Sequence, residues 1–328
     1  MADRFVAPDI LVLASGGTLG EAWMSGLLAG VEDATGHDFR RTESFVGTAA
    51  GSLVAAALAG GQRPRRAGTA WQRRSLATGP ASDDLGEQSA TQLGWARLRA
   101  PRAIAGSLAR EALRFAGAAA TPLAPTALAI GSNGSAALRA ALLHRAPGGD
   151  TSLSAIHERV SATGARFDGR LRVVAVDRER GRRVVFGAPG APEATVAQAV
   201  QASCSVPWIF APVQIAGREY VDGGVWSNTN LDVAPAGRAT EVLCLNPIAS
   251  LDIALASPFG VLRALAGSTA ALETLSLRNR GARVRMIGPD RESAAIMGPN
   301  LMDALLRDAA RAAGYAQGVA AVGESVGV

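Results

Sequence analysis

The sequence predicts an α/β fold built around a central, mostly parallel sheet. Near the N-terminus, residues 9–36 and 43–61 each contain a short apolar strand, a glycine turn and a helix in succession. Repeated strand–turn–helix units are typical of parallel sheets covered by helices. Strand-like segments return after residue 170. The chain has 328 residues, 48% of them hydrophobic, which is ample for a buried core.

The two N-terminal units are the clearest elements. In the first, "DILVLA" at 9–14 predicts a buried strand, and the segment 20–36 has helical periodicity that stops at Gly36. In the second, "ESFVG" at 43–47 predicts a buried strand. The small-residue helix that follows it can end at Gly60 and Gly61.

The second half of the chain predicts further strands and helices. Two hairpins are expected, at 170–187 with a turn at Arg180-Gly181 and at 211–222 with a turn at Ala216-Gly217. Buried strands are expected at "EVLCLNP" and "ARVRMIGP". The expected helices cover 192–207 and 262–278, and a final helix begins near Leu301.

Residues 62–150 interrupt this pattern. Between Gly61 and Arg145 there are 12 arginines and four acidic residues, and an amphipathic helix is expected at 101–115, with Arg110 and Arg114 on its polar face. We expect one domain over 1–328, in which 62–150 forms a helical, Arg-rich lid or cap. The basic charge fits either a solvated face or a surface that meets an anionic membrane. No nucleic-acid motif is present.

Several classes of protein are disfavoured. The N-terminus has no secretory signal pattern, and no apolar run reaches the roughly 20 residues that span a bilayer. Cys204 and Cys244 lie in apolar surroundings, which predicts buried thiols in a reducing cytoplasm. No cluster has the spacing of metal ligands, and we expect neither a metal nor a cofactor. No histidine follows Asp222, so a Ser-His-Asp triad in the α/β-hydrolase order is excluded with that acid.

Three short motifs could carry chemistry. The first is the turn Ser15–Gly20, whose backbone N–H groups at Gly16, Gly17 and Thr18 could bind a phosphate or an oxyanion at a helix N-terminus. The second, "GTAAG" at 47–51, has the small residues of a nucleophile elbow at Gly47 and Gly51, but Ala49 stands at its centre. The third is Asp222 before Gly223 and Gly224. Each motif alone is also common as an ordinary turn.

Together, in this order and spacing, the motifs resemble the patatin-like phospholipase family. Further similarity lies in "GRRVVFG" at 181–187, "AVQASCSVPWIFAPV" at 199–213 and "DGGVWSNTN" at 222–230. The resemblance covers roughly 9–60 and 170–290. It implies a three-layer α/β fold and a Ser–Asp dyad that hydrolyses a lipid or other acyl ester. The nucleophile position is Ala49, the base is Asp222, and the oxyanion hole is formed around Gly16, Gly17 and Thr18.

Ala49 departs from the family pattern at its most important position. Loss of a serine nucleophile costs on the order of 10⁶ in turnover in a well-studied protease, so the chain as written is expected to be essentially inactive. One explanation is a deliberate Ser→Ala substitution, which we favour because the acid and the glycine turn remain. The other is a natural pseudoenzyme that binds lipid or regulates. An acyltransferase of the same fold is a further alternative. We expect the protein to be cytoplasmic, with peripheral membrane contact through 62–150.

Overall fold

A single sheet forms the centre of the molecule. The computed structural model describes residues 5–65, 140–141, 143–144, 149, 151–207, 209–249 and 258–323. Within that part of the chain the sheet has eight short strands. They are β1 (Ile10–Leu13), β2 (Ser44–Thr48), β3 (Leu171–Asp177), β4 (Arg182–Phe186), β5 (Val213–Ile215), β6 (Arg218–Asp222), β7 (Glu241–Leu245) and β8 (Arg283–Ile287).

The strand order is β5-β6-β3-β2-β1-β7-β8, and β4 also pairs with β3. Strands β3, β2, β1, β7 and β8 run parallel, whereas β4, β5 and β6 belong to antiparallel pairs at one side. This arrangement confirms the prediction of a mostly parallel α/β sheet. Strand β1 lies in the middle and is fully flanked, which explains why "ILVL" is apolar at every position.

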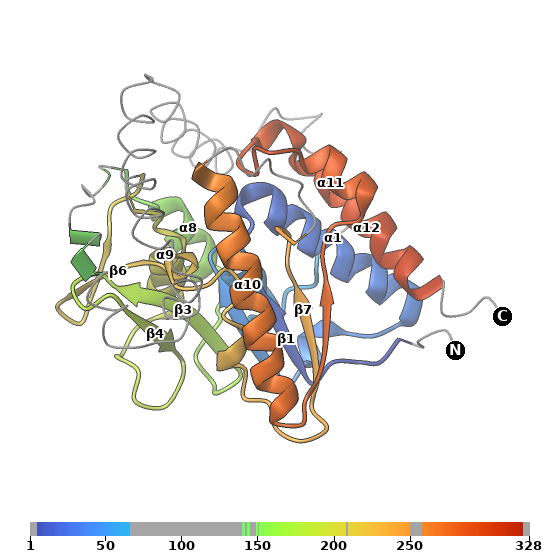
Figure 1. Cartoon of the computed structure of the whole chain (residues 1–328), viewed down its shortest axis with the longest axis horizontal. Helices are drawn as coiled ribbons and strands as arrows, with labels where there is room; N and C mark the ends of the chain where they lie inside the picture. Colours follow the sequence, from blue (N-terminus) through green and yellow to red (C-terminus); the bar gives the residue numbers. More distant parts are fainter. Residues whose placement is uncertain are drawn as a thin grey trace.

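Helices cover both faces of the sheet. Leu11 and Leu13 of β1 point into the core shared with α1, α2 and α9, whereas Ile10 and Val12 point into a second core that includes Leu277 of α10. Figure 1 shows α10 crossing one face, with α1 and α12 together at the side of β7. The helices are α1 (Gly17–Thr35), α2 (Ala50–Ala59), α8 (Ser154–Ser161), α9 (Val196–Cys204), α10 (Pro258–Asn279), α11 (Arg291–Met297) and α12 (Arg307–Gly323).

Helices α1 and α12 approach one another closely because glycines face backbone on both sides. A Cβ added at Gly26 or Gly30 of α1 would collide with the carbonyl oxygens of α12. In the same way, a Cβ at Gly314 or Gly318 of α12 would collide with carbonyl oxygens of α1. The C-terminal helix is therefore packed backbone to backbone against the helix that follows the first glycine turn.

Most predicted elements agree with the structure to within a few residues. The end of α1 at the left-handed Gly36 and both hairpin turns are confirmed. The prediction of a final helix from Leu301 is wrong, because the last helix begins at Arg307 after a short 3-10 turn that Asp303 caps. Cys244 is buried as expected, but Cys204 is only partly buried. The predicted lid at 62–150, with its helix at 101–115, falls almost entirely outside the described residues.

Candidate active site

The turn between β2 and α2 holds Ala49 in a strained conformation. Ala49 has φ 48° and ψ −120°, a region that residues with a Cβ rarely occupy. Two serines hold it there. The Ala49 amide donates to Ser203 Oγ at 2.9 Å, and the Ala49 carbonyl accepts from both the amide and the hydroxyl of Ser52, at 2.9 and 2.6 Å. The turn is thus fixed in the backbone shape of a nucleophile elbow, with a methyl group at its tip.

Glycines on either side of Ala49 allow the helix to pack closely behind the strand. A Cβ at Gly51 would overlap the carbonyl of Leu13 in β1, and a Cβ at Gly47 would overlap the backbone of Ser52. No side chain can be added at either position without moving backbone. The structure therefore gives a steric reason for both glycines of "GTAAG".

Asp222 ends β6 as a buried carboxyl group. It is only 6% exposed, and its Oδ1 accepts from the Gly224 amide at 2.5 Å. Burial raises the pKa of Asp222 from 3.8 to about 7, although the Gly224 hydrogen bond opposes the shift. A carboxyl group with such a pKa can exchange a proton near neutral pH, which suits a general base.

The sheet brings Asp222 close to Ala49. In β3, Val174 is opposite Thr48 of β2 and its neighbour Ala175 is opposite Asp222 of β6. The residue after Asp222 bends across β3, so that a Cβ on Gly223 would lie 3.1 Å from Thr48 Cγ2. Ala49 and Asp222 are therefore the chain neighbours of two residues, Thr48 and Gly223, that lie close together.

Asn230 ties these two segments together. It adopts a left-handed conformation, and its Nδ2 donates to Thr48 Oγ1 at 3.1 Å and to the Gly223 carbonyl at 3.3 Å. Its own Oδ1 accepts from Arg183, which also forms two 2.6 Å hydrogen bonds to Asp232. The segment "DGGVWSNTN" is thus held against the end of β2 by polar side chains.

The first glycine turn presents backbone N–H groups beside this site. Gly16 is the N-cap of α1, and Gly17 has a left-handed φ of 61°. In the described part of the chain, the amides of Gly16, Gly17 and Thr18 donate to no acceptor, whereas the Leu19 amide donates to the Leu301 carbonyl at 2.9 Å. Free amides at the positive end of a helix can bind an anionic oxygen.

The first turn also meets the Asp-Gly-Gly segment directly. The Ser15 amide donates to the carbonyl of Asn228 at 2.9 Å. A Cβ on Gly224 would lie 3.1 Å from Ser15 Oγ. All three predicted motifs therefore gather at one end of the sheet, with the two catalytic candidates, Ala49 and Asp222, both at least nine-tenths buried.

Sequence reasoning did not identify the residues that support the site. Ser203, Ser52 and Asn230 make their decisive hydrogen bonds to residues of other elements or to the elbow itself. Ser203 also donates to the Val174 carbonyl at 2.6 Å, which links α9 to β3. The only signal in the sequence was that Ser203 and Asn230 fall inside segments similar to the family.

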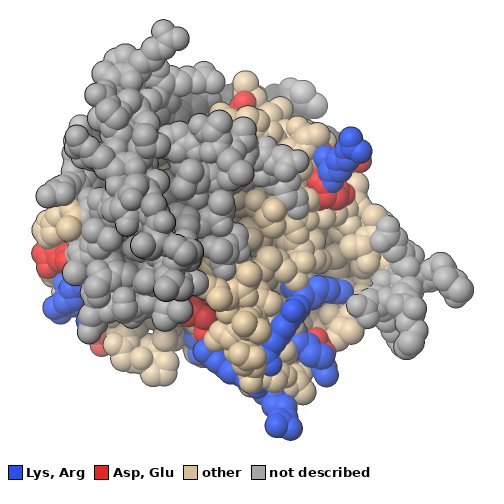
Figure 2. Space-filling model, viewed as in Figure 1, with Lys and Arg blue, Asp and Glu red and all other residues tan. Residues whose placement is uncertain are grey.

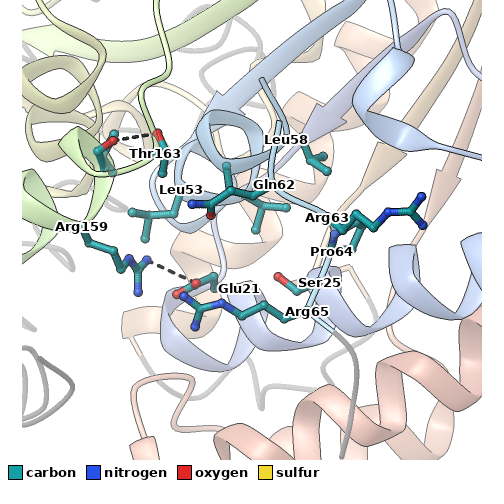
Figure 3. Close-up of a pocket in the computed structure, with 13 residues that line it drawn as sticks. Glu21, Ser25, Leu53, Leu58, Gln62, Arg63, Pro64, Arg65, Arg159 and Thr163 are labelled. Atoms are coloured by element: carbon teal, nitrogen blue, oxygen red, sulfur yellow. Dashed lines mark hydrogen bonds and ion pairs between the residues drawn. The ribbon is translucent and has the colours of Figure 1, made fainter. Parts of the chain in front are cut away.

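A separate pocket lies between α1, α2 and α8 (Figure 3), and it contains none of the three motifs. The buried carboxylate of Glu21 lies at this pocket, 3.2 Å from Arg159 and 3.4 Å from Arg307. Burial alone would raise the pKa of Glu21, but the positive charges of Arg159, Arg307, Arg65 and Arg311 outweigh it and lower the pKa to about 2. Glu21 is therefore an ionised structural group that joins α1 to α8 and α12.

Other kinds of site find little support. No group of three or more His, Cys, Asp or Glu side chains in the described ranges could hold a metal ion. None of the helices described is long and apolar enough to cross a membrane.

Figure 2 shows basic side chains gathered at the lower edge of the view, where α10 ends and β8 begins. Arg278, Arg280 and Arg283 are exposed in this part of the chain. Arg110 and Arg114 lie outside the described residues.

Comparison with known proteins agrees with these motifs. A family model described as patatin-like phospholipase matches residues 11–235, and no curated protein sequence matches the chain. Among solved structures, VipD from Legionella pneumophila is 16% identical with a TM-score of 0.39, over 97% of this chain and 67% of its own. The type III effector protein ExoU is also 16% identical, with a TM-score of 0.35, and the match covers 97% of this chain and 53% of the effector. Because the family model covers more than half of the sequence and all three motifs, the chain belongs to the patatin-like phospholipase family.

Proposed function

We propose that this site is a patatin-like acyl-ester hydrolase site in which Ala49 occupies the nucleophile position. Membership of the family supports a lipid hydrolase in general. The proposed site consists of Ala49, the base Asp222, and an oxyanion hole formed by the amides of Gly16, Gly17 and Thr18. Gly47, Gly51, Gly223 and Gly224 give these groups their positions. The proposed substrate is a phospholipid, a lysophospholipid or a simpler acyl ester.

The observation that supports this proposal is the strained backbone conformation of Ala49. Residues held in such sparsely populated conformations cost about 1–3 kcal/mol and are concentrated at active sites. Here Ser203 and Ser52 maintain the strain with hydrogen bonds to the backbone on either side of the Ala49 Cα. An ordinary turn between a strand and a helix has no need of this conformation.

A hydroxyl at position 49 would complete a familiar reaction. The Asp222 carboxylate would accept the hydroxyl proton while the oxygen attacks the ester carbonyl carbon. The amides at the start of α1 would stabilise the charge on the carbonyl oxygen. When the ester C–O bond breaks, Asp222 would return the proton to the leaving alcohol, and an acyl group would remain on the enzyme. Without the hydroxyl this covalent step has no nucleophile.

The test is to restore the hydroxyl. Ala49→Ser is compared with the parent chain and with Ala49→Ser/Asp222→Asn, using a short chromogenic ester and a lysophospholipid. We expect hydrolysis in the single variant and its loss in the double variant. Ser205→Ala is a suitable control, because its hydroxyl only donates to the Gln201 carbonyl within α9. A folded Ala49→Ser protein without activity on a broad ester panel would refute the proposal.

The absence of a hydroxyl from Ala49 favours one other candidate, a non-catalytic lipid-binding or regulatory protein. Such a protein would bind vesicles without turnover whichever residue stands at position 49. Restored activity in Ala49→Ser would instead support a substitution that vacated a working site. If alcohols accept the acyl group in place of water, the activity is acyl transfer. We further propose one domain, with residues 62–150 as the lid that meets an anionic membrane.

A further inference from the structure

Ser15 has a buried hydroxyl group that satisfies no hydrogen bond. The residue is 9% exposed, and its Oγ has no partner among the residues that the structure describes. Buried polar atoms in proteins are nearly always hydrogen-bonded, and an exception calls for a reason. Ser15 stands at the start of the first glycine turn, and its amide rather than its hydroxyl makes the hydrogen bond to Asn228.

The unpartnered hydroxyl and the acid both lie beside Gly224. The position that a Cβ on Gly224 would take lies 3.1 Å from Ser15 Oγ and 2.9 Å from Asp222 Oδ1. The side-chain oxygen of Asn228 lies 3.6 Å from the same point. Because residue 224 is a glycine, it places no side chain of its own beside the hydroxyl and the carboxyl group. The Ser15 hydroxyl and the Asp222 carboxyl group therefore both lie close to Gly224.

The location of Ser15 is fixed by backbone contacts. Its amide donates to the Asn228 carbonyl at 2.9 Å, which joins the glycine turn to the Asp-Gly-Gly segment. The next three residues carry the free amides of the proposed oxyanion hole. Ser15 is therefore hydrogen-bonded to the segment that carries the base, and it immediately precedes the amides that would bind the carbonyl oxygen.

We propose that Ser15 and Asp222 together hold the water molecule that releases the acyl group from the enzyme. This inference rests on the proposed function and adds a catalytic residue to it. The water would form one hydrogen bond to the Ser15 hydroxyl and one to the Asp222 carboxylate. Ser15 thereby aims the water oxygen at the acyl carbon, and Asp222 accepts its proton.

The step balances without any other reactant. The water oxygen forms a bond to the acyl carbon while Asp222 takes one proton from the water. The tetrahedral intermediate then breaks its bond to the oxygen introduced at position 49. Asp222 gives its proton to that oxygen, and a free carboxylic acid leaves. Ser15 changes neither its covalent bonds nor its charge, so its effect is confined to release of the acyl group.

The experiment separates formation of the acyl-enzyme from its hydrolysis. Ala49→Ser and Ala49→Ser/Ser15→Ala are mixed with a p-nitrophenyl ester, and the reactions are quenched during turnover. Intact-protein and peptide mass spectrometry then measure the fraction acylated at position 49. We expect Ser15→Ala to lower turnover by about tenfold or more, the usual effect of losing one positioned hydrogen bond. The acylated fraction should rise at the same time.

Two further measurements separate this role from a structural one. Ser15→Thr, which keeps the hydroxyl, should restore most of the turnover. Hydroxylamine, a strong nucleophile that needs little positioning, should accelerate release of the acyl group more in the Ser15→Ala variant than in its parent. Thermal unfolding of each variant identifies any loss of folded protein.

Several results would overturn the inference. Turnover that is unchanged, or that falls without an increase in the acylated fraction, would show that Ser15 does not act in release. An acyl adduct on Ser15 itself, in the chain that keeps Ala49, would show that Ser15 is a nucleophile. Absence of both turnover and an adduct at position 49 in folded Ala49→Ser would refute the proposed function as well.

Discussion

The strained backbone at Ala49 makes a quantitative prediction about stability. Ala49→Gly removes the cost of holding a residue with a Cβ at φ 48° and ψ −120°, which is about 1–3 kcal/mol. Glycine also gives the unfolded chain more freedom and buries one methyl group less, which costs about 1 kcal/mol. The hydrogen bonds of Ser203 and Ser52 are made to the backbone and stay in place. We expect Ala49→Gly to equal or slightly exceed the stability of the parent chain.

Ala57→Gly is a matched control, because it lowers the stability by the same cost of introducing glycine but relieves no backbone strain. Ala57 lies inside α2, eight residues after Ala49, and is half-buried in ordinary helix. Ala57→Gly should destabilise the protein by about 1 kcal/mol. Ala49→Gly should therefore be more stable than Ala57→Gly by about 2 kcal/mol, or about 3 °C in Tm for a domain of this size. Urea and thermal unfolding followed by circular dichroism measure both differences.

One result would refute the reasoning. If Ala49→Gly loses as much stability as Ala57→Gly, the elbow stores no strain, and the observation that carries the proposed function fails. A loss larger than that of Ala57→Gly would mean that the Ala49 methyl group makes packing contacts that the geometry does not suggest.

Two further predictions concern buried carboxyl groups of opposite character. The pKa of Asp222 is raised to about 7, so its ionisation should cost about 4 kcal/mol of stability as the pH rises from about 4 to about 7. Asp222→Asn should therefore stabilise the protein at pH 8 more than at pH 4.5, and an equal gain at both pH values in urea unfolding would contradict this. Glu21 has a lowered pKa of about 2, so its contribution is present above pH 4.5 and is lost as the pH falls towards 2. Glu21→Gln should cost about 3 kcal/mol at pH 7 by removing the buried carboxylate that pairs with Arg159 and Arg307, and a cost no greater than that of the exposed Glu158→Gln would count against it.

The sequence was most informative where local chemistry decides structure. The apolar runs of β1 and β2 are buried on both faces of the sheet, which leaves no alternation that could be mistaken for another element. Gly36 and the Ala216-Gly217 pair adopt left-handed conformations, and glycine at a segment end is a strong local signal for such a bend. The resemblance to the family implied that the three motifs form one site, and the structure gathers them at one end of the sheet.

The features of the fold and the site that the sequence does not predict depend on contacts between residues that are distant in the chain. The motif "GTAAG" indicates an elbow, but it does not show that the Ala49 amide is held by Ser203, 154 positions further along the chain. The start of α12 differs from the prediction because Leu301 accepts the Leu19 amide of α1 instead of beginning a helix. No feature of the sequence gives the Ser15 hydroxyl a role, and only its position near Gly224 and Asp222 suggests one.

The glycine contacts between α1 and α12 have a mechanical consequence. Two helices whose backbones are in direct contact have almost no room to move relative to one another, so a displacement of one helix also displaces the other. The segment before α12 also reaches the free end of α1, where Leu301 accepts the Leu19 amide and a Cβ on Gly17 would collide with the Met302 sulfur. A force applied to α12 and the short turn before it would thus also act on α1 and on the amides of the first turn of α1. The C-terminal helix is therefore packed directly against the helix whose first turn carries the amides of the proposed oxyanion hole, although it lies beyond the stretch by which the family is recognised.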